Sequence, residues 1–368
     1  MTAVVGSGNS VKNIVENLEK LHNVSIGAGV VYYVGIGGLA LGGGWSFFSR
    51  QHGLLTQNIV EMNVVTADGE ILTTNNKQNT DLFAALRGAG GGNFGVVTHF
   101  QINAFYANHT LIFLEMSVSI DNFVEIFEKW QQFVFLENLS TSGVIFFTRD
   151  IIGIHVVINN YDVEKSREYS KKVSDLFMVP GMTVDVYEYN FTSMYNHFQR
   201  YLGDFQGLQK AKSFFVNRIL NRNEIERMFL SLKKNLKQFE NIVVECVQFG
   251  GMIRNLRKHS SYIHNDANYI FEIYSFENET FADSSIAAVN KIMLELSFFS
   301  TFYSYQNVVD DDLSIASYYG HKLPFLMHMK CKYDSENLFT FNQSIPLPYY
   351  CIENKCNKQS IRNMYWQS

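Results

Sequence analysis

The sequence is poor in the residues and runs that mark several classes of protein. It has only four prolines and four cysteines in 368 residues. No apolar run reaches the roughly eighteen residues of a membrane-spanning helix. Charged residues make up 18% and the net charge is -5, so no basic surface for nucleic acid or an anionic membrane is indicated. The hydrolase G-x-S-x-G turn, the H-E-x-x-H zinc motif and the Walker phosphate loop are also absent.

The cysteines and asparagines give few signals about location or metal binding. Cys351 and Cys356 are close enough in sequence to pair or to share a metal, but no other Cys or His lies near them, which favours an inert tail. Asn-x-Ser/Thr occurs at Asn108, Asn190, Asn278 and three further sites of an asparagine-rich chain, which leaves secretion unproven. We expect no signal peptide at the start of the chain as given. His99, His155, His197 and His264 also lack the spacing of metal ligands. The sequence therefore predicts no metal site and leaves the location of the protein unknown.

Glycine, in contrast, is concentrated in two clusters. V-G-I-G-G-L-A-L-G-G-G-W-S begins at Val34, and D-L-F-A-A-L-R-G-A-G-G-G-N-F-G-V-V-T begins at Asp81. Between them, residues 59–74 alternate apolar and polar side chains around Asp68-Gly69, which predicts a β-hairpin. Bare backbone at strand ends suits contact with a pyrophosphate. For any single glycine, a tight turn inside a β-rich domain is the alternative explanation.

The order of these segments resembles the PCMH-type FAD-binding domain of the vanillyl-alcohol-oxidase superfamily, and within it the berberine-bridge-enzyme-like oxidoreductases. In that family V-G-I-G-G-L-x-L-G-G-G is followed by S-R-x-x-G-L-x-x-D-N, a hairpin, and D-L-F-W-A-L-R-G-G-G-G-N-F-G-I-V-T. Here the middle link, from Ser49 to Asn58, reads S-R-Q-H-G-L-L-T-Q-N. Near the other end, S-Y-Q-N-V-V-D-D-D-L from Ser304 and Y-Y-G-H-K-L-P-F-L from Tyr318 are similar to the family's Y-x-N-Y-x-D-x-x-L and Y-Y-G-x-N-x-x-R-L.

The resemblance implies an α+β fold of two unlike parts. We expect a PCMH-type FAD-binding domain, N-terminally incomplete, and a substrate domain with an antiparallel sheet and helices on one face. Family members carry a further βα lobe whose R-S-x-G-H-type loop wraps the FAD pyrophosphate and often supplies a histidine for a covalent flavin bond, and we expect this chain to lack it. The expected segments are 1–106 (FAD domain), 107–303 (substrate domain), 304–346 (a segment returning to the FAD domain) and 347–368 (tail).

Apolar periodicity predicts the elements of the substrate domain. The expected strands are 110–118, 144–148, 154–158, 183–189, 242–248 and 269–274. The expected helices are 122–136, 163–177, 223–239 and 284–299, with a further helix over 10–21 in the first domain and another over 321–332 in the returning segment.

The cofactor implied by the resemblance is FAD, bound without a covalent bond if it binds. The cysteine that anchors flavin in some relatives aligns with Val31 here. The aspartate of the middle link, the arginine of a family H-R motif and the asparagine of Y-Y-G-x-N are replaced by Gln57, Asn265 and Lys322. The residues implied to contact FAD are Gly35, Gly37, Gly38, Gly42, Gly43, Gly44, Ser49, Asn58, Gly90, Gly91, Gly92, Asn93, Phe94, Gly95, Val96, Asn307 and Tyr319.

The candidate catalytic residues are Glu272, Tyr274 and Tyr305. Ile270, Glu272 and Tyr274 alternate along one expected strand and so share a face, from which Glu272 or Tyr274 can reach the flavin. The alternative is that Glu272 faces solvent beside a Lys or Arg. Tyr305 carries the family's Y-x-N, although the tyrosine that usually follows its asparagine is Val308 here.

The implied activity is that of an FAD-dependent oxidase or dehydrogenase. Such an enzyme takes a hydride from a small organic or sugar-like substrate to flavin N5, and a Tyr, Glu or Asp accepts a proton. Oxygen or another electron acceptor is the implied second partner; nucleic acid and membrane are not expected. Two alternatives remain: a truncated relative that keeps the fold without tight flavin binding, and a small-molecule binding protein.

Overall fold

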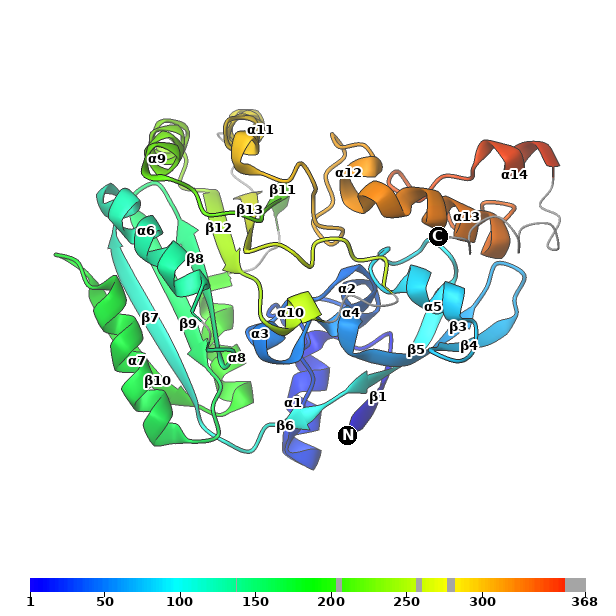
Figure 1. The fold of residues 1–368 in the computed structure, drawn as a ribbon, viewed down its shortest axis with the longest axis horizontal. Coiled ribbons are helices and arrows are strands. Elements are labelled where there is room, and N and C mark those ends of the chain that lie inside the picture. Colours follow the sequence, from blue (N-terminus) through cyan, green and yellow to red (C-terminus); the bar gives the residue numbers. More distant parts are fainter. Residues whose placement is uncertain (137, 203–206, 256–259, 277–281, 355–368) are drawn as a thin grey trace.

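The computed structural model describes residues 1–136, 138–202, 207–255, 260–276 and 282–354. Its strands form a four-stranded sheet, a seven-stranded sheet and a two-stranded pair. The two larger sheets lie in different halves of the molecule, here called the glycine-rich lobe and the sheet lobe (Figure 1). Within the described residues, every helix is too short or too polar to cross a lipid bilayer.

The glycine-rich lobe is built on the four-stranded antiparallel sheet, in the order β1-β5-β3-β4. The predicted hairpin is present: the Thr66 amide donates to the Glu70 carbonyl at 2.9 Å, and Gly69 has a φ of 79°. A left-handed φ at this point is why the turn requires glycine. The strands are β1 (Thr2–Gly6), β3 (Ile59–Val65), β4 (Ile71–Asn75) and β5 (Val96–Asn103), with the short pair β2 (Val24–Ser25) and β6 (Phe105–Tyr106).

The helices of this lobe are short except the first. α1 (Val11–His22) begins where predicted, because the Ser10 hydroxyl accepts a hydrogen bond from the Asn13 amide at 3.3 Å. Its buried side chains recur at Val11, Ile14 and Val15, the spacing of a helix with one face against the sheet. The others are α2 (Ile36–Gly42), α3 (Ser49–His52), α4 (Leu55–Asn58) and α5 (Thr80–Leu86).

The sheet lobe contains the seven-stranded antiparallel sheet, in the order β10-β7-β9-β8-β12-β13-β11. Each of the six predicted strands is present, and β11 is an additional edge strand. The strands are β7 (Leu111–Ser119), β8 (Thr141–Phe147), β9 (Ile151–Ile158), β10 (Thr183–Tyr189), β11 (Leu208–Val216), β12 (Ile242–Gln248) and β13 (Tyr269–Phe276).

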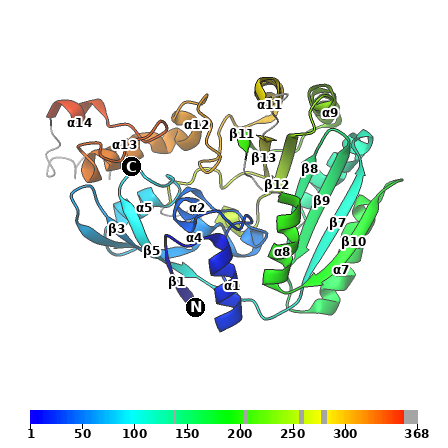
Figure 2. The ribbon, with the colours of Figure 1, turned by 180° about the vertical axis from the view of Figure 1, so that it is seen from behind.

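Alternate residues of each strand enter two different cores. On β7, Ile112 and Leu114 pack among the helices that cover one face, whereas Phe113 points to the opposite face and the glycine-rich lobe. The predicted helical face is formed by α6 (Phe123–Val134), α7 (Val163–Phe177), α9 (Arg222–Leu236) and α11 (Ala282–Leu296). The opposite face is partly covered too, because α8 (Phe191–Leu202) lies there beside α1 (Figure 2). The short α10 (Met252–Asn255) follows β12.

The C-terminal segment returns from the sheet lobe to the glycine-rich lobe (Figure 1). Its helix α13 (Leu323–Tyr333) begins after Lys322, with Pro324 in the first turn, and packs on α5. The predicted range of 321–332 was wrong at its start, where Gly320–Lys322 form a 3-10 turn. Lys330 and Asp334, both fully buried, form an ion pair at 2.6 Å, and Lys330 also donates to the Asn93 carbonyl at 3.1 Å. α12 (Ala316–Tyr319) precedes and α14 (Tyr349–Asn354) follows this helix.

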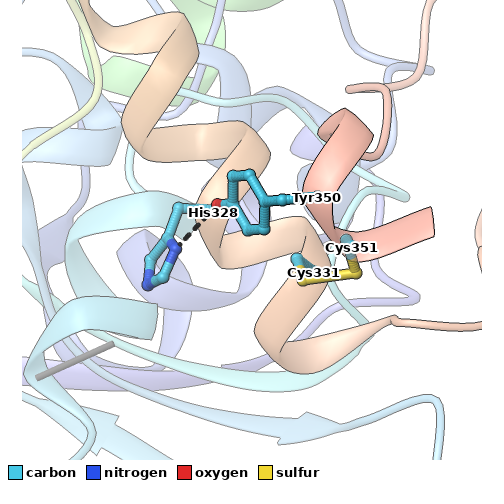
Figure 3. Close-up of a disulfide and its surroundings, with 4 residues drawn as sticks. All are labelled: His328, Cys331, Tyr350 and Cys351. Atoms are coloured by element: carbon cyan, nitrogen blue, oxygen red, sulfur yellow. Dashed lines mark hydrogen bonds between the residues drawn. A yellow bond between two sulfur atoms is a disulfide. The ribbon is translucent and has the colours of Figure 1, made fainter. Parts of the chain in front are cut away.

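The prediction that Cys351 belongs to an inert tail or pairs with Cys356 was wrong. Cys351 forms a disulfide with Cys331 across α13 and α14, with the two Cα atoms 5.9 Å apart (Figure 3). His328 and Tyr350 form a hydrogen bond of 3.0 Å beside it. The pairing joins residues 20 positions apart, a contact that sequence spacing alone does not indicate. Cys356 and Asn278 lie outside the described residues.

Candidate active site

A cavity of about 800 Å³ lies between the two lobes, and the returning segment closes part of it. This volume falls in the range of sites that hold small molecules or cofactors. The three walls come from the glycine clusters, from β11 to β13 of the large sheet, and from residues 305–309 with parts of the chain beyond them. No cluster of three or more His, Cys, Asp or Glu side chains suited to a metal occurs within the described part of the chain.

The sheet wall carries the first two candidate catalytic residues. Ile270, Glu272 and Tyr274 of β13 all line the cavity, as expected for alternate residues of one strand. The Tyr274 hydroxyl donates to a Glu272 carboxylate oxygen at 2.7 Å. Glu272 therefore faces the cavity beside a tyrosine, and its predicted alternative of a solvent position beside Lys or Arg was wrong.

A second carboxyl group lies directly across the sheet from Glu272. Glu245 of β12 is paired in register with Glu272 of β13, so the two side chains are neighbours on one face. Burial raises the pKa of Glu272 to about 7, opposed by the Tyr274 hydrogen bond. Burial, followed by repulsion from Glu272, raises the pKa of Glu245 to about 8. Both carboxyl groups thus exchange protons near neutral pH, the range that suits a proton acceptor.

Tyr305 reaches the cavity from the returning segment. Its phenol oxygen accepts hydrogen bonds from the Gly44 amide at 2.7 Å and from the Asn307 side chain at 3.0 Å. The Asn307 amide also donates to the Leu39 carbonyl at 3.1 Å. Burial raises the pKa of Tyr305 to about 12, although these two donors act in the opposite direction. Tyr305 therefore binds the first glycine cluster firmly and stays protonated at neutral pH.

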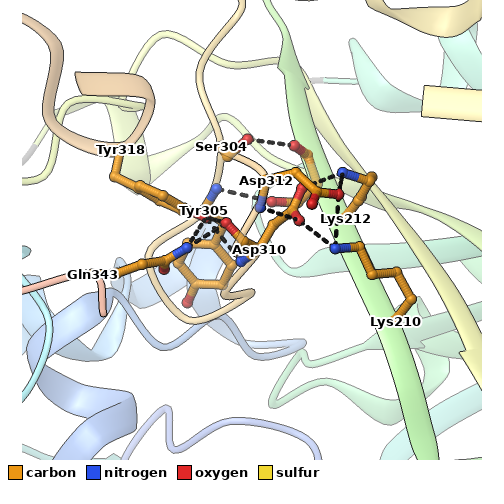
Figure 4. Close-up of polar contacts among 9 residues, drawn as sticks. Lys210, Lys212, Ser304, Tyr305, Asp310, Asp312, Tyr318 and Gln343 are labelled. Carbon is orange, nitrogen blue, oxygen red and sulfur yellow. Dashed lines mark hydrogen bonds and ion pairs between the residues drawn. The ribbon is translucent and has the colours of Figure 1, made fainter. Parts of the chain in front are cut away.

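An ionic cluster holds the returning segment against the sheet (Figure 4). Lys210 and Lys212 of the edge strand β11 both contact Asp310 and Asp312, at distances from 2.5 to 3.0 Å. The Asp310 side chain is fully buried, and Gln343 donates to the Asp310 carbonyl. Hydrogen bonds from the two lysines lower the pKa of Asp312 to about 2.

The same segment is fixed next to Tyr305 by two shorter links to β11. The Tyr305 amide donates to the Ser213 hydroxyl at 2.9 Å, and the Ser304 hydroxyl donates to the Ser213 carbonyl at 2.8 Å (Figure 4). Together with the ionic cluster, these bonds fix the position from which Tyr305 and Asn307 enter the cavity.

The glycine wall fits a large planar or phosphate-bearing cofactor. Gly35 and Gly38 line the cavity, and a Cβ added at either position would meet no atom within 4 Å, so the added carbon would project into open space. At Gly90 the nearest atom to such a carbon is the Tyr319 hydroxyl at 3.8 Å. Bare backbone thus faces the cavity from both glycine clusters, which is what close approach of a pyrophosphate or a flavin ring requires.

The residues predicted to contact FAD divide into two groups. The structure brings the first group together around the cavity: Gly35, Gly38, Gly90, Gly91, Asn93, Asn307 and Tyr319. The remaining ten are not among its lining residues: Gly37, Gly42, Gly43, Gly44, Ser49, Asn58, Gly92, Phe94, Gly95 and Val96.

Several members of the second group have structural contacts that account for the residue type. A Cβ at Gly43 would come within 2.8 Å of the Tyr305 ring, and one at Gly44 within 2.7 Å of Leu55. Glycine is therefore needed at these two positions because a larger residue would clash with the neighbouring side chain. Ser49 is buried and its hydroxyl accepts from the Ser46 amide at 2.9 Å. The Asn58 side chain donates to the His52 carbonyl at 2.8 Å. These residues are not among those that line the cavity, and their contacts lie within the protein.

Other cavity residues were not identified from the sequence. Trp45, Phe249, Phe341 and Gln343 line the cavity, and Trp45 follows the first glycine cluster directly. The position of Trp45 directly after the glycine motif was the sequence signal that could have placed it at the cavity. Phe249 was not predicted to line the cavity, because its place on the wall depends on how β12 pairs with its neighbours.

Known proteins match this chain in its fold and in the sequences of its two end segments. Residues 1–75 match the FAD binding domain family, and residues 304–346 match the berberine and berberine-like family. The FAD-linked oxidoreductase YgaK of Bacillus subtilis is 26% identical over 337 residues, which cover 88% of this chain and 73% of that protein. The BBE-like 1 structure from Physcomitrella patens has a TM-score of 0.85 at 26% identity, covering 95% of this chain and 78% of that one.

A third match is the glucooligosaccharide oxidase of Acremonium strictum, with a TM-score of 0.84 at 20% identity over 94% of this chain and 77% of that one. At this identity the likeness concerns the fold. A second structure of that oxidase is described with a 6-S-cysteinyl, 8α-N1-histidyl FAD. The family models matched at both ends, the relative that covers 88% of this chain and the shared α+β architecture support one conclusion: the chain is similar to the berberine-bridge-enzyme-like FAD-linked oxidoreductases of the PCMH type.

Proposed function

We propose that this chain oxidises a small organic substrate with bound FAD, taking a hydride from a carbon atom while a side chain accepts a proton. The observation that carries the proposal is the Glu272–Tyr274 pair, which lines the same cavity as the glycine clusters. When bound, FAD supplies the two-electron acceptor at N5. Electrons then pass to oxygen or to another acceptor.

Glu272 is the proposed proton acceptor. Its pKa of about 7 leaves a substantial fraction ionised at neutral pH, yet keeps the carboxylate basic enough to take a proton from a substrate hydroxyl. Tyr274 orients the carboxylate through its hydrogen bond of 2.7 Å. Tyr305 is proposed to shape the site, because its oxygen already accepts from Gly44 and Asn307 and its pKa is about 12.

The proposed FAD is held without a covalent bond to Val31. This residue lines the cavity at the position of the family's anchoring cysteine, and its side chain has no sulfur to form a thioether. The contacts proposed instead are those of bare backbone at Gly35, Gly38, Gly90 and Gly91.

The first experiment is the absorption spectrum of the purified full chain, before and after acid precipitation. We expect flavin bands in the native sample and their transfer to the supernatant, since no covalent bond retains the flavin. A folded, colourless protein that takes up no added FAD contradicts the proposal and favours a relative that has lost the cofactor. Flavin that stays in the precipitate contradicts only the non-covalent mode.

The second experiment is the substitution Glu272→Gln, which keeps size and removes the proton acceptor. We expect the rate of flavin reduction to fall by about 10²- to 10⁴-fold, with flavin content unchanged. The matched control is Glu240→Gln, because Glu240 pairs with Arg149 on the surface. A variant that reduces its flavin at the original rate would exclude Glu272 as the acceptor.

A further inference from the structure

We infer that helix α8 of the sheet lobe positions residues 28–32 of the cavity wall, and that Tyr195 and Gln199 thereby govern how tightly flavin is held. The inference rests on the proposed FAD site, to which it adds two positioning residues. Both lie outside the glycine clusters and are not among the residues that line the cavity. It is carried by the hydrogen bonds that join α8 to the backbone of this segment.

The segment forms part of the cavity wall without regular secondary structure. Residues 26–34, all of which the structure describes, run from β2 towards α2 and form neither a helix nor a strand. Gly29, Val30 and Val31 of this stretch line the cavity. Backbone groups outside helices and sheets need other partners when they leave water. The position of this wall therefore depends on which groups bind its backbone.

Tyr195 binds the first part of the segment. The Tyr195 side chain is buried, and its hydroxyl donates to the carbonyl oxygens of Ala28 and Gly29, at 3.1 and 3.0 Å. The Tyr195 ring also stacks on the Tyr32 ring, with 5.8 Å between the two centroids. One tyrosine of the sheet lobe thus holds two neighbouring carbonyl groups of the wall.

Gln199 lies one turn further along α8 and binds the next part of the segment. The Tyr32 amide donates to the side-chain oxygen of Gln199 at 2.9 Å, and its side-chain nitrogen donates to the Val30 carbonyl at 2.7 Å. These partners fix the orientation of the amide, because an N–H group must meet its oxygen and a carbonyl group must meet its nitrogen. One side chain therefore binds the residue before Val31 and the residue after it.

The helix that carries these two residues is attached to both lobes. On the sheet, the Tyr189 hydroxyl lies 2.8 Å from Nδ1 of His197, and Nε2 of His197 lies 3.3 Å from a Glu115 carboxylate oxygen. In the first turn of α8, the Thr192 amide donates to the Glu19 carboxylate of α1 at 2.6 Å, where the two helices lie side by side (Figure 2). α8 is therefore a fixed support for the segment.

Such a support matters most for a cofactor that no covalent bond retains. Val31 stands at the position of the family's anchoring cysteine and lines the cavity. A wall that is already ordered costs less free energy when a ligand binds, so affinity falls when the supports of that wall are removed. Gln199 provides two of these hydrogen bonds, and their loss should weaken FAD binding about tenfold.

The first test is Gln199→Met on the full chain, which keeps the length of the side chain and removes both hydrogen bonds. FAD affinity is measured by quenching of flavin fluorescence, and hydrogen exchange of residues 28–32 by mass spectrometry. We expect FAD to bind about tenfold more weakly and the exchange to become faster. The matched control is Asn196→Met, at an exposed position of the same helix, which should change neither quantity.

Faster exchange with unchanged FAD affinity overturns the inference, and so does unchanged exchange. A parent chain that takes up no FAD contradicts the proposed function together with the flavin part of the inference. The exchange of residues 28–32 then decides the positioning part by itself.

Gln199→Glu distinguishes a positioning role from a loss of folding. An ionised carboxylate still accepts from the Tyr32 amide but cannot donate to the Val30 carbonyl, whereas a protonated carboxyl group has one donor and one acceptor, like the amide. Relative to the parent chain, we expect FAD affinity to be about tenfold lower at about pH 8 and to recover at about pH 5.

The charged and titratable groups around this position are the same in the variant and the parent chain. Lys12, Glu16 and Glu19 of α1 lie near the Tyr32 ring, and Tyr195 stacks on it. Asn196→Asp is the control for the added charge and should show no such recovery. An affinity of Gln199→Glu that stays low at about pH 5, or that equals the parent value at about pH 8, overturns the inference.

Discussion

Among single residues, Glu272 has the surroundings that most change its chemistry. Among the residues that the structure describes, the titratable groups that face it are Glu245 across the sheet, Tyr274 on its own strand, and Tyr262 and Tyr305 beyond the strand. None of these is a cation. Burial therefore raises the pKa of Glu272 to about 7, and the hydrogen bond from Tyr274 is the contact that lowers it. Glu272 therefore becomes ionised, and able to accept a proton, only as the pH rises through this value.

Tyr274→Phe should raise the pKa of Glu272 further, because it removes the hydrogen bond that stabilises the carboxylate. We expect the acidic limb of flavin reduction by substrate to move by about one pH unit to higher pH. Stability gives a second measurement. A folded-state pKa above the ordinary value means that the folded protein loses stability as pH rises from about 4.5 to about 7. In the variant this loss should extend to higher pH.

The control for this experiment is Tyr333→Phe, whose hydroxyl donates to the Asp81 carboxylate at 3.0 Å away from the cavity lining. In this variant, the acidic limb of flavin reduction and the pH dependence of stability near pH 7 should both be unchanged. A limb that moves to lower pH in Tyr274→Phe would mean that Tyr274 does not stabilise the charged form.

At the scale of elements, local periodicity predicted most strands and helices of the sheet lobe, but not β11 and α8. On β11, Lys210 and Lys212 interrupt the apolar pattern, and their partners Asp310 and Asp312 lie about a hundred residues later. No local rule can supply such partners. α8 is different, because its buried Phe191, Met194, Tyr195 and Phe198 have helical spacing. That signal was present in the sequence and was missed.

Asp310→Asn should loosen the returning segment. The Asp310 side chain is fully buried and contacts both Lys210 and Lys212. When its negative charge is removed, the two ammonium groups keep only the more exposed Asp312 as an ionic partner within this cluster. Breaking a buried ion cluster costs about 3 kcal/mol. We expect urea unfolding to show this loss, and amide exchange to rise around Tyr305 and Ser304.

Asp121→Asn is the matched surface control, since the Asp121–Lys233 pair is exposed on both sides. It should change stability by less than about 1 kcal/mol. Equal effects of the two substitutions would show that the buried cluster does not hold the segment in place.

At the scale of the whole molecule, the order of motifs indicated the family and the two lobes, but not how the lobes contact each other. Gln57 and Asn265 illustrate the limit. Each departs from the family pattern in a separate motif, and the structure shows them hydrogen-bonded at 2.9 Å across 208 positions of sequence. Two amides thus stand where the family has an aspartate and an arginine. In the sequence they are two separate departures, because one sequence cannot reveal that two positions touch.

Arg50 joins the lobes more strongly. From α3 its guanidinium donates to the carbonyls of Phe249, Leu136, Thr141 and Val134, at 2.7, 2.9, 3.0 and 3.3 Å. All four acceptors belong to the sheet lobe. Burial lowers the pKa of Arg50 to about 10, so it still carries its charge at neutral pH.

Arg50→Met keeps the apolar stem and removes a buried guanidinium that donates to four carbonyls of the sheet lobe, which should cost about 3 kcal/mol. Because the lost contacts all cross between lobes, we expect calorimetry to show a broader transition or two separate ones, with the cavity residues exposed first. Arg149→Met removes only exposed pairs with Asp150 and Glu240, so we expect a single transition at a nearly unchanged temperature. If Arg50→Met instead unfolds in one sharp step at a lower temperature, the lobes stay coupled through the returning segment, and Arg50 contributes stability without being the contact that unites them.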